Sequence, residues 1–248
     1  MSGGSDKQLL AADGKRLSGR TETDLRSVSM SVGLLKQANG SAMVEWGKNK
    51  VLAAVYGPRE VFPKHQTNPH KARISFRYVM APFCSMEEHG RAGPNRRSIE
   101  ISKVLKHVFE NLVLVNQFPK TSVDISTEVI QSDGGTRVAA LTAASLALVD
   151  AGIPVRDLVS PISVGKINGK MVVDLDKDED NFGSSDMPVG FSHRTGEIVL
   201  WQMDGMLSRD ELARGLDMAF EASKKVRELQ LEALKAKYGT AEQADNNG

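Results

Sequence analysis

The pattern of hydrophobic and polar positions predicts β-strands in the first part of the chain. Apolar residues recur in 41–46 and in 51–56, which indicates two strands joined around Gly47, and Gly57-Pro58 ends the second. In residues 72–80, isoleucine, phenylalanine and tyrosine alternate with arginine and serine. Because successive side chains of a strand point to opposite faces, one face of this third strand is expected to be wet or functional.

Helical periodicity predicts three helices. From Ser98 onward, apolar residues follow the spacing of an amphipathic helix, and residues 138–149 are almost continuously apolar. A last helix is predicted from Ser208, where Ser208 and Glu211 fit a capping box, to about Tyr238. The apolar positions of the first helix are Ile101, Val104, Leu105, Val108 and Leu112.

A β-hairpin is predicted in the second half of the chain. Residues 162–167 and 171–175 flank Asn168-Gly169, a dipeptide that is typical of two-residue hairpin turns, and residues 197–203 form a further strand. Strands and helices therefore alternate in mixed order, without a tandem repeat. This order predicts an α+β fold in which helices pack on mixed sheets.

Both ends of the chain are polar, and we expect them to be loosely held. The interpretation is a flexible leader over residues 1–11, one folded domain over residues 12–238 and a polar tail over residues 239–248. No Pro- or Ser-rich linker divides the middle segment.

Composition limits the classes of function. With 248 residues, of which 40% are hydrophobic, the chain can build a substantial core, and its net charge of +1 gives no bulk attraction for nucleic acid. Cys84 is the only cysteine, which excludes an internal disulfide and a multi-cysteine zinc site and favours a cytoplasmic location. No apolar run approaches the ~20 residues that span a bilayer, so no membrane association is expected.

The motif Gln131-Ser-Asp-Gly-Gly-Thr-Arg137 predicts an anion site. It lies between the alternating apolar residues of 123–129 and the helix predicted from Val138. Two glycines allow backbone N–H groups to turn toward a ligand, the helix N-terminus adds partial positive charge, and Thr136 and Arg137 add directional donors. Phosphate suits this arrangement. A tight turn without a ligand is the alternative.

Arg96 and Arg97 immediately precede the helix predicted from Ser98. A helix N-terminus favours anions by ~0.3–1 kcal/mol, so two adjacent cations there gain most when a bound phosphate neutralises them. The alternative is a solvated pair in which Arg97 reaches Glu100.

An acidic run, residues 174–188, follows the predicted hairpin. Carboxylates at this density repel one another unless something neutralises them, and Mg²⁺ held by one or two carboxylates and substrate phosphates would do so. An EF-hand does not fit, because a frame from Asp176 places Asn181 where glycine is needed and Met187 where glutamate is needed. A solvated acidic turn remains the alternative.

Other chemistry-bearing residues give weaker signals. The five histidines show no metal-ligand spacing, and no nucleotide-binding glycine pattern is present. A basic stretch fits either a polyanion contact or a solvated loop. It consists of Lys64, His65, His70, Lys71 and Arg73.

Three motifs together resemble the RNase PH family in order and spacing. They are Gln131-Ser-Asp-Gly-Gly-Thr-Arg137, Asn95-Arg-Arg-Ser98 and Glu179-Asp-Asn-Phe-Gly-Ser-Ser-Asp-Met187. Further stretches look like the catalytic RNase PH-type subunits of archaeal exosomes, and the resemblance covers residues 12–238. These stretches are Asp13-Gly-Lys-Arg16 with Gly19-Arg20, Tyr56-Gly-Pro58 and Ala147-Leu-Val-Asp-Ala-Gly-Ile-Pro154.

The resemblance implies a fold similar to the second domain of ribosomal protein S5, which agrees with the predicted α+β class. It implies a 3′-to-5′ exoribonuclease in which inorganic phosphate is the nucleophile and nucleoside diphosphates are released, a reaction that reverses to 3′ tail synthesis. A phosphate and a phosphodiester are both anionic, so bringing them together needs cations and oriented N–H donors.

The resemblance also assigns roles to residues. Those that match its phosphate-binding loop are Gly135, Thr136 and Arg137. Arg96 and Arg97 match its pair that grips the RNA backbone, and Lys64 falls in the loop that lines the narrow opening through which RNA passes. Asp180 and Asp186 match its catalytic aspartates, which are associated with Mg²⁺, and Asp180 is our choice for the acid that protonates the leaving oxygen.

Partners follow from the same resemblance. It implies a single-stranded RNA 3′ end as substrate, a hexameric ring built with an inactive RNase PH-like partner subunit, and RNA-binding cap proteins. The alternatives are a homohexameric RNase PH that trims tRNA, a non-catalytic ring scaffold and, more distantly, a small-molecule kinase. All motif residues are present, which favours an active subunit over a scaffold.

Overall fold

The computed structural model describes residues 8–11, 14–85 and 95–245, with side chains described up to residue 239. In these parts of the chain, two five-stranded sheets pack with four α-helices. The α+β class predicted from the sequence is confirmed.

The first sheet has the strand order β1-β2-β3-β5-β4. Neighbouring strands are antiparallel except for β4 and β5, which run parallel. The strands are β1 (Val28–Val32), β2 (Gly40–Trp46), β3 (Asn49–Glu60), β4 (Arg73–Met80) and β5 (Thr121–Gln131).

The second sheet has the order β10-β8-β6-β7, and β9 also pairs with β8. Its strands are β6 (Val159–Ile167), β7 (Lys170–Val173), β8 (Ser185–Ser192), β9 (Glu197–Trp201) and β10 (Asp204–Gly205). Because β9 and β10 follow the same edge of β8, they act as one edge strand interrupted at Gln202 and Met203. The interruption lies opposite Pro188, whose carbonyl accepts a hydrogen bond from the Gln202 N–H (3.1 Å).

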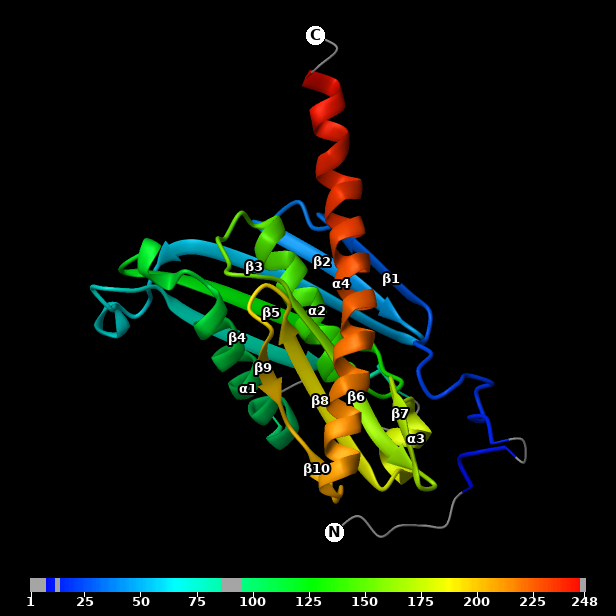
Figure 1. The fold of residues 1–248 in the computed structure, drawn as a ribbon. Helices are drawn as coiled ribbons and strands as arrows, with labels where there is room; N and C mark the ends of the chain where they lie inside the picture. Colours follow the sequence, from blue (N-terminus) through cyan, green and yellow to red (C-terminus); the bar gives the residue numbers. More distant parts are fainter. Residues whose placement is uncertain (1–7, 12–13, 86–94, 246–248) are drawn as a thin grey trace.

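The helices are α1 (Arg96–Leu112), α2 (Thr136–Asp150), α3 (Lys177–Phe182) and α4 (Arg209–Asp245). Short 3₁₀ turns lie at Lys64–Gln66 and Val115–Gln117. In Figure 1, α2 lies between the two sheets, and α4 runs along the second sheet and extends past the first. This arrangement explains the unbroken apolar character of α2, which has protein on all sides.

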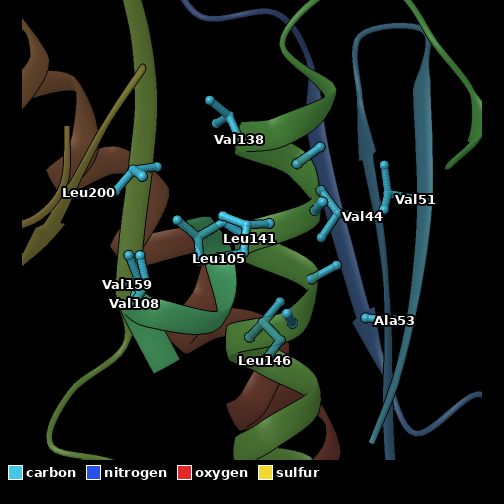
Figure 2. Close-up of a cluster of buried hydrophobic side chains, with 14 of the residues drawn as sticks. Val44, Val51, Ala53, Leu105, Val108, Val138, Leu141, Leu146, Val159 and Leu200 are labelled. Carbon is cyan, nitrogen blue, oxygen red and sulfur yellow. The ribbon is translucent and has the colours of Figure 1, made fainter. Parts of the chain in front are cut away.

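One hydrophobic core joins the two sheets. Leu141 and Leu146 of α2 are fully buried between Val44 and Val51 of the first sheet and Val159 of the second (Figure 2). Since each fully buried leucine or valine contributes roughly 1.5–3 kcal/mol, this shared layer holds the sheets in a fixed relation. The chain therefore packs as a single unit.

Most predicted elements are confirmed, with shifts at their ends. Helix α1 begins at Arg96, two residues earlier than predicted, because Asn95 caps it through a capping box with Ser98. The capping box of Ser208 and Glu211 is present at the start of α4, but that helix continues to Asp245, beyond the predicted end at Tyr238. Strands β1, β8 and β10 and helix α3 had not been predicted.

Only part of the predicted leader lies within the described residues. Its residues 1–7 lie outside the described residues, as do residues 12–13 and 246–248. The expectation of loose packing is wrong at Leu9, which is 2% exposed and packs with Ile167, Val172 and Leu175. No helix in the described part of the chain is long and apolar enough to cross a membrane.

Candidate active site

A cavity of about 510 Å³ opens between the start of α2, the first turn of α1, α3 and the interrupted edge of the second sheet. The cavity contains most of the site residues predicted from the sequence. Its lining residues are Arg97, Glu100, Gly135, Thr136, Arg137, Val138, Ser163, Asp180, Asn181, Asp186, Pro188, Gln202, Met203 and Asp204.

The glycine loop, residues 132–135, joins the end of β5 to the first residue of α2 as predicted. Gly134 and Gly135 have φ angles of +72° and +67°, a region that suits glycine, and Gly135 is the N-cap of α2. The buried Asn49 side chain holds the loop through its amide group, which donates to the Gly134 carbonyl (2.6 Å) and accepts from the Asp133 N–H (2.6 Å). The N-terminus of α2 therefore faces the cavity on a fixed support.

The side chain of Thr136 is held by a hydrogen bond with a tyrosine. The Tyr78 and Thr136 hydroxyls lie 2.9 Å apart, and both side chains are buried. Burial raises the pKa of Tyr78, so the phenol stays protonated at neutral pH. The alternation of apolar and polar residues in 72–80 predicted which face of the strand Tyr78 occupies, but it did not predict the contact with Thr136.

Arg137 presents its guanidinium to the cavity. Its Nη1 donates to Gln202 Oε1 (2.6 Å), and its Nη2 lies 3.9 Å from Glu100 Oε1. Among the described residues, the buried Nε has no hydrogen-bond partner. An unpaired buried donor is costly, so this group favours an anionic ligand. Gln202 comes from the interruption between β9 and β10, and nothing in the sequence pointed to it.

The two arginines of α1 differ in position. Both are exposed, but Arg97 lines the cavity and Arg96 does not. The alternative pairing of Arg97 with Glu100 is not found in the described part of the chain, where Glu100 instead approaches Arg137. Lys64 lies outside the cavity, and its exposed ammonium pairs with Glu60 (3.2 Å).

Asp180 and Asp186 both line the cavity, and each influences the pKa of the other. Burial and the negative charge of Asp180 raise the pKa of Asp186 to about 7. Burial also raises the pKa of Asp180, although Arg97 and Arg137 oppose the shift. A pKa of about 7 leaves Asp186 about half protonated at pH 7.

Asp204 is a further carboxylate of the cavity, and the sequence did not single it out. It stands directly opposite Asp186 in the pairing of β10 with β8, and its charge further raises the pKa of Asp186. In the described part of the chain, no group of three or more carboxylate, histidine or cysteine side chains is placed to hold a metal ion. Asp180 and Asp186 alone fit Mg²⁺, which commonly uses one or two carboxylates and completes its shell with phosphate oxygens and water.

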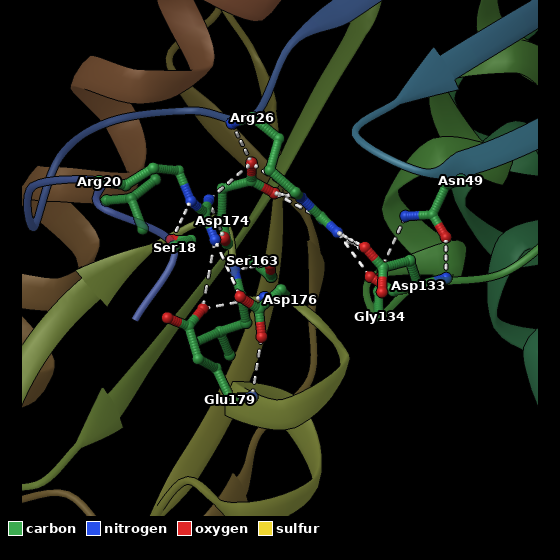
Figure 3. A network of polar contacts seen from close by, with 12 residues as sticks. Ser18, Arg20, Arg26, Asn49, Asp133, Gly134, Ser163, Asp174, Asp176 and Glu179 are labelled. Carbon is green, nitrogen blue, oxygen red and sulfur yellow. Dashed lines mark hydrogen bonds and ion pairs between the residues drawn. The ribbon is translucent and has the colours of Figure 1, made fainter. Parts of the chain in front are cut away.

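Three other carboxylates of the acidic run, those of Asp174, Asp176 and Glu179, pair with arginines of the chain itself. Arg16 pairs with Glu179, and Arg26 pairs with Asp174 (2.7 Å). Arg20 lies within 3.4 Å of Asp174, Asp176 and Glu179. The prediction that something must neutralise these carboxylates is correct, and three arginines near the N-terminus contribute to it; Figure 3 shows two of them, Arg20 and Arg26.

Comparisons with known proteins bear on this site. Residues 24–154 match "3′ exoribonuclease family, domain 1" and residues 157–222 match "3′ exoribonuclease family, domain 2". The boundary between the two matches falls between α2 and β6, and it coincides with the change from the first sheet to the second.

Several archaeal proteins are similar over nearly their whole length. The exosome complex component Rrp41 of Thermococcus onnurineus is 53% identical over 94% of this chain and 93% of that protein. The component of the same name from Thermoplasma acidophilum is 47% identical over 93% of each chain.

Solved structures share the fold. Rice Rrp46 matches with a TM-score of 0.79 and 27% identity, over 89% of this chain and 100% of that one. A chain of the Archaeoglobus fulgidus exosome with RNA bound to the active site matches with a TM-score of 0.75 and 24% identity, over 87% of this chain and 92% of that one. At that identity the second likeness is a likeness of fold.

Proposed function

This chain belongs to the 3′ exoribonuclease family, the RNase PH family, and on that premise we propose that it shortens RNA from the 3′ end by phosphorolysis. In this reaction inorganic phosphate attacks the last phosphodiester and a nucleoside diphosphate leaves. The reverse reaction adds nucleotides to a 3′ end.

The proposal is carried by one observation, namely that a single cavity holds an anion-binding loop and a pair of buried carboxyl groups. The Gly135 to Arg137 segment supplies N–H groups and a guanidinium with an unpaired Nε, and Arg97 adds a second positive charge. Asp180 and Asp186 line the same cavity. Cations and proton-holding groups within one cavity suit a reaction between two anions.

The proposed chemistry needs no side-chain nucleophile. An oxygen of inorganic phosphate, held by Arg137 and the loop, forms a bond to the phosphorus of the terminal nucleotide. The bond from that phosphorus to the 3′ oxygen of the preceding nucleotide breaks, and this oxygen takes up a proton. Arg97 and Arg137 offset the negative charge that the two phosphates bring together.

The aspartate pair is the proposed source of that proton. Asp180 was our choice for the acid, but Asp186 has the pKa of about 7, so we assign the proton to the pair as a unit. Alternatively, the same two residues would hold Mg²⁺ as ionised carboxylates, and the metal ion would then neutralise the phosphate and leaving oxygens in place of the carboxyl proton.

The partners are part of the proposal. Relatives with about half of their residues identical are named as exosome components, which supports assembly into an exosome. We propose a hexameric ring with an inactive RNase PH-like partner subunit, RNA-binding cap proteins and a single-stranded RNA 3′ end as substrate. Arg96 and Lys64 would contact RNA outside the cavity, and a cytoplasmic location is consistent with the single cysteine.

Arg137→Ala tests the phosphate site. We expect the variant, co-expressed with the partner subunit and assayed on unstructured RNA, to lose phosphate-dependent release by a factor of about 10²–10³, as for removal of a transition-state donor. Arg214→Ala is the matched control, because Arg214 lies exposed on α4 and pairs only with Glu22 (3.2 Å) in the described part of the chain. Unchanged phosphorolysis in Arg137→Ala would exclude the phosphate-site assignment.

A further inference from the structure

We propose that Arg26 is a positioning residue that locks the glycine loop and the acidic segment, residues 174–180, at a fixed separation. The inference rests on the proposed function, since these two segments would hold the attacking phosphate and the catalytic carboxyl groups. Arg26 itself does not line the cavity, and none of the sequence motifs contains it.

The side chain of Arg26 reaches both segments at once. Its Nη1 donates to the Asp133 carbonyl (2.6 Å) in the glycine loop. Its Nη2 and Nε donate to the carboxylate of Asp174 (2.7 and 3.1 Å), and its backbone N–H donates to the same carboxylate (2.6 Å). The side chain is only 9% exposed. Figure 3 shows this bridge, with Asn49 holding the loop from the other side.

The acidic segment needs such an anchor because its backbone is strained at Asp174. This residue has φ +59°, a region that a non-glycine residue rarely adopts, and its side chain is 1% exposed. Two residues later, Asp176 caps α3, the six-residue helix that carries Asp180. The geometry that Arg26 imposes on Asp174 is therefore passed directly to the start of α3.

The two segments also touch each other. A Cβ atom built on Gly134 would lie 2.5 Å from the Asp176 carbonyl carbon, so the loop packs against the acidic segment with no space for a side chain. Gly135, the N-cap of α2, in turn lines the same cavity as Asp180. A loop displaced from Arg26 would carry its N–H groups away from Asp180.

Asn49 and Arg20 each support one segment alone. Among the described residues, Asn49 forms hydrogen bonds with the glycine loop but none with the acidic segment. Arg20 contacts Asp174, Asp176 and Glu179 but has none with the loop. Of the described side chains around these segments, Arg26 is the one whose hydrogen bonds join them.

A lysine at position 26 separates the charge of Arg26 from its bridging geometry. The lysine ammonium group can pair with Asp174, but it lacks the planar guanidinium, which donates to the Asp174 carboxylate and to the Asp133 carbonyl at the same time. Because displacements of about 1 Å cost up to 10²-fold in rate, a loosened loop is expected to weaken use of phosphate. Binding of RNA through Arg96 and Arg97 does not depend on this bridge.

The experiment compares Arg26→Lys with Arg20→Lys in the complex formed with the partner subunit. Arg20 is a matched control, since it is also largely buried and paired with Asp174. We expect Arg26→Lys to raise the KM for inorganic phosphate about tenfold, equivalent to ~1.4 kcal/mol, with the KM for RNA unchanged. Arg20→Lys should leave the phosphate KM within about twofold, whatever it does to thermal stability.

A second measurement detects phosphate binding without turnover. Inorganic phosphate should raise the melting temperature of the wild-type complex, and Arg26→Lys should need a higher phosphate concentration for the same rise. If Arg26→Lys does not fold, Asp174→Asn replaces it, because asparagine keeps the shape and one acceptor oxygen, and the same selective loss of phosphate affinity is expected.

The outcomes separate the two claims. An unchanged phosphate KM in folded Arg26→Lys, or in folded Asp174→Asn, would overturn the positioning role. Equal losses in Arg26→Lys and Arg20→Lys would also overturn it, because they would reflect general support of the acidic segment. No phosphate-dependent release by the wild-type complex would instead contradict the proposed function.

Discussion

Removal of Arg16 is predicted to destabilise the chain strongly. Arg16 and Glu179 form an ion pair in which the two side chains are 1% and 3% exposed. Arg16 Nε donates to Glu179 Oε1 (2.7 Å), and its two Nη atoms donate to the carbonyls of Val173 (2.7 Å) and Asp174 (2.8 Å). Arg16→Met keeps an unbranched side chain that fills part of the same space and removes all of these donors.

The magnitude follows from what is left behind. Glu179 would remain buried, with Arg20 as its remaining cation at 3.4 Å. Breaking a buried pair by removing one partner costs about 3–5 kcal/mol, and in a chain of this size each kcal/mol lowers Tm by roughly 2–4 °C, so a fall of roughly 6–20 °C is expected. Total stabilities of about 5–15 kcal/mol make this a large share.

Urea unfolding of a double-mutant cycle tests the reasoning. Glu179→Gln in the Arg16→Met background removes the uncompensated charge, so the double variant should be more stable than Arg16→Met alone. In the wild-type chain the Asp176 N–H donates a hydrogen bond to Glu179 Oε2 (3.0 Å), and glutamine keeps an acceptor oxygen for it. A loss below about 1 kcal/mol in Arg16→Met, or strictly additive effects in the cycle, would refute the buried-pair argument.

Two further predictions concern packing and pH. Gly40→Ala should lower the free energy of unfolding in urea by about 1–3 kcal/mol, because the new Cβ would lie 2.2 Å from the Ala151 nitrogen. Gly239→Ala is the control: Gly239 lies in α4 with open space around it, so this variant should be neutral or stabilising. Equal effects of the two variants would contradict the steric account. Burial alone would raise the pKa of Asp157, but hydrogen bonds, first that from Arg227 (2.9 Å), outweigh it and lower the pKa below the unfolded value of about 3.9. The stabilising contribution of the Asp157 carboxylate is therefore complete above about pH 4 and is lost as the pH falls through the lower folded-state pKa. Asp157→Asn should for this reason lose more unfolding free energy at pH 7 than at pH 3. A larger loss at pH 3 would contradict the inferred direction of the pKa shift.

The elements that position the cavity could be predicted where local pattern and burial agree. The alternation in 123–129 became β5, and the apolar run 138–149 became α2, because a strand end, two glycines and a helix start are all local signals. The turn Asn168-Gly169 likewise joins β6 to β7. The site residues carried by these signals, from Gly135 to Arg137, lie where they were expected.

Contacts between distant parts of the chain could not be predicted in this way. Arg16, Arg20 and Arg26 lie about 150 residues before the carboxylates that they neutralise, and no periodicity links the two segments. Gln202 reaches Arg137 only because the edge strand breaks at that point. Asp204 lies in the cavity because β10 pairs with β8 in the register that places Asp204 opposite Asp186.

The most direct test of the central claim is the identity of the product released from RNA. The wild-type chain, co-expressed with an RNase PH-like partner subunit, is incubated with 3′-unstructured RNA and Mg²⁺, with and without inorganic phosphate, and the released nucleotides are identified by mass. The account predicts nucleoside diphosphates that form only when phosphate is present. Nucleoside monophosphates released without phosphate would contradict it, because water rather than phosphate would then be the nucleophile.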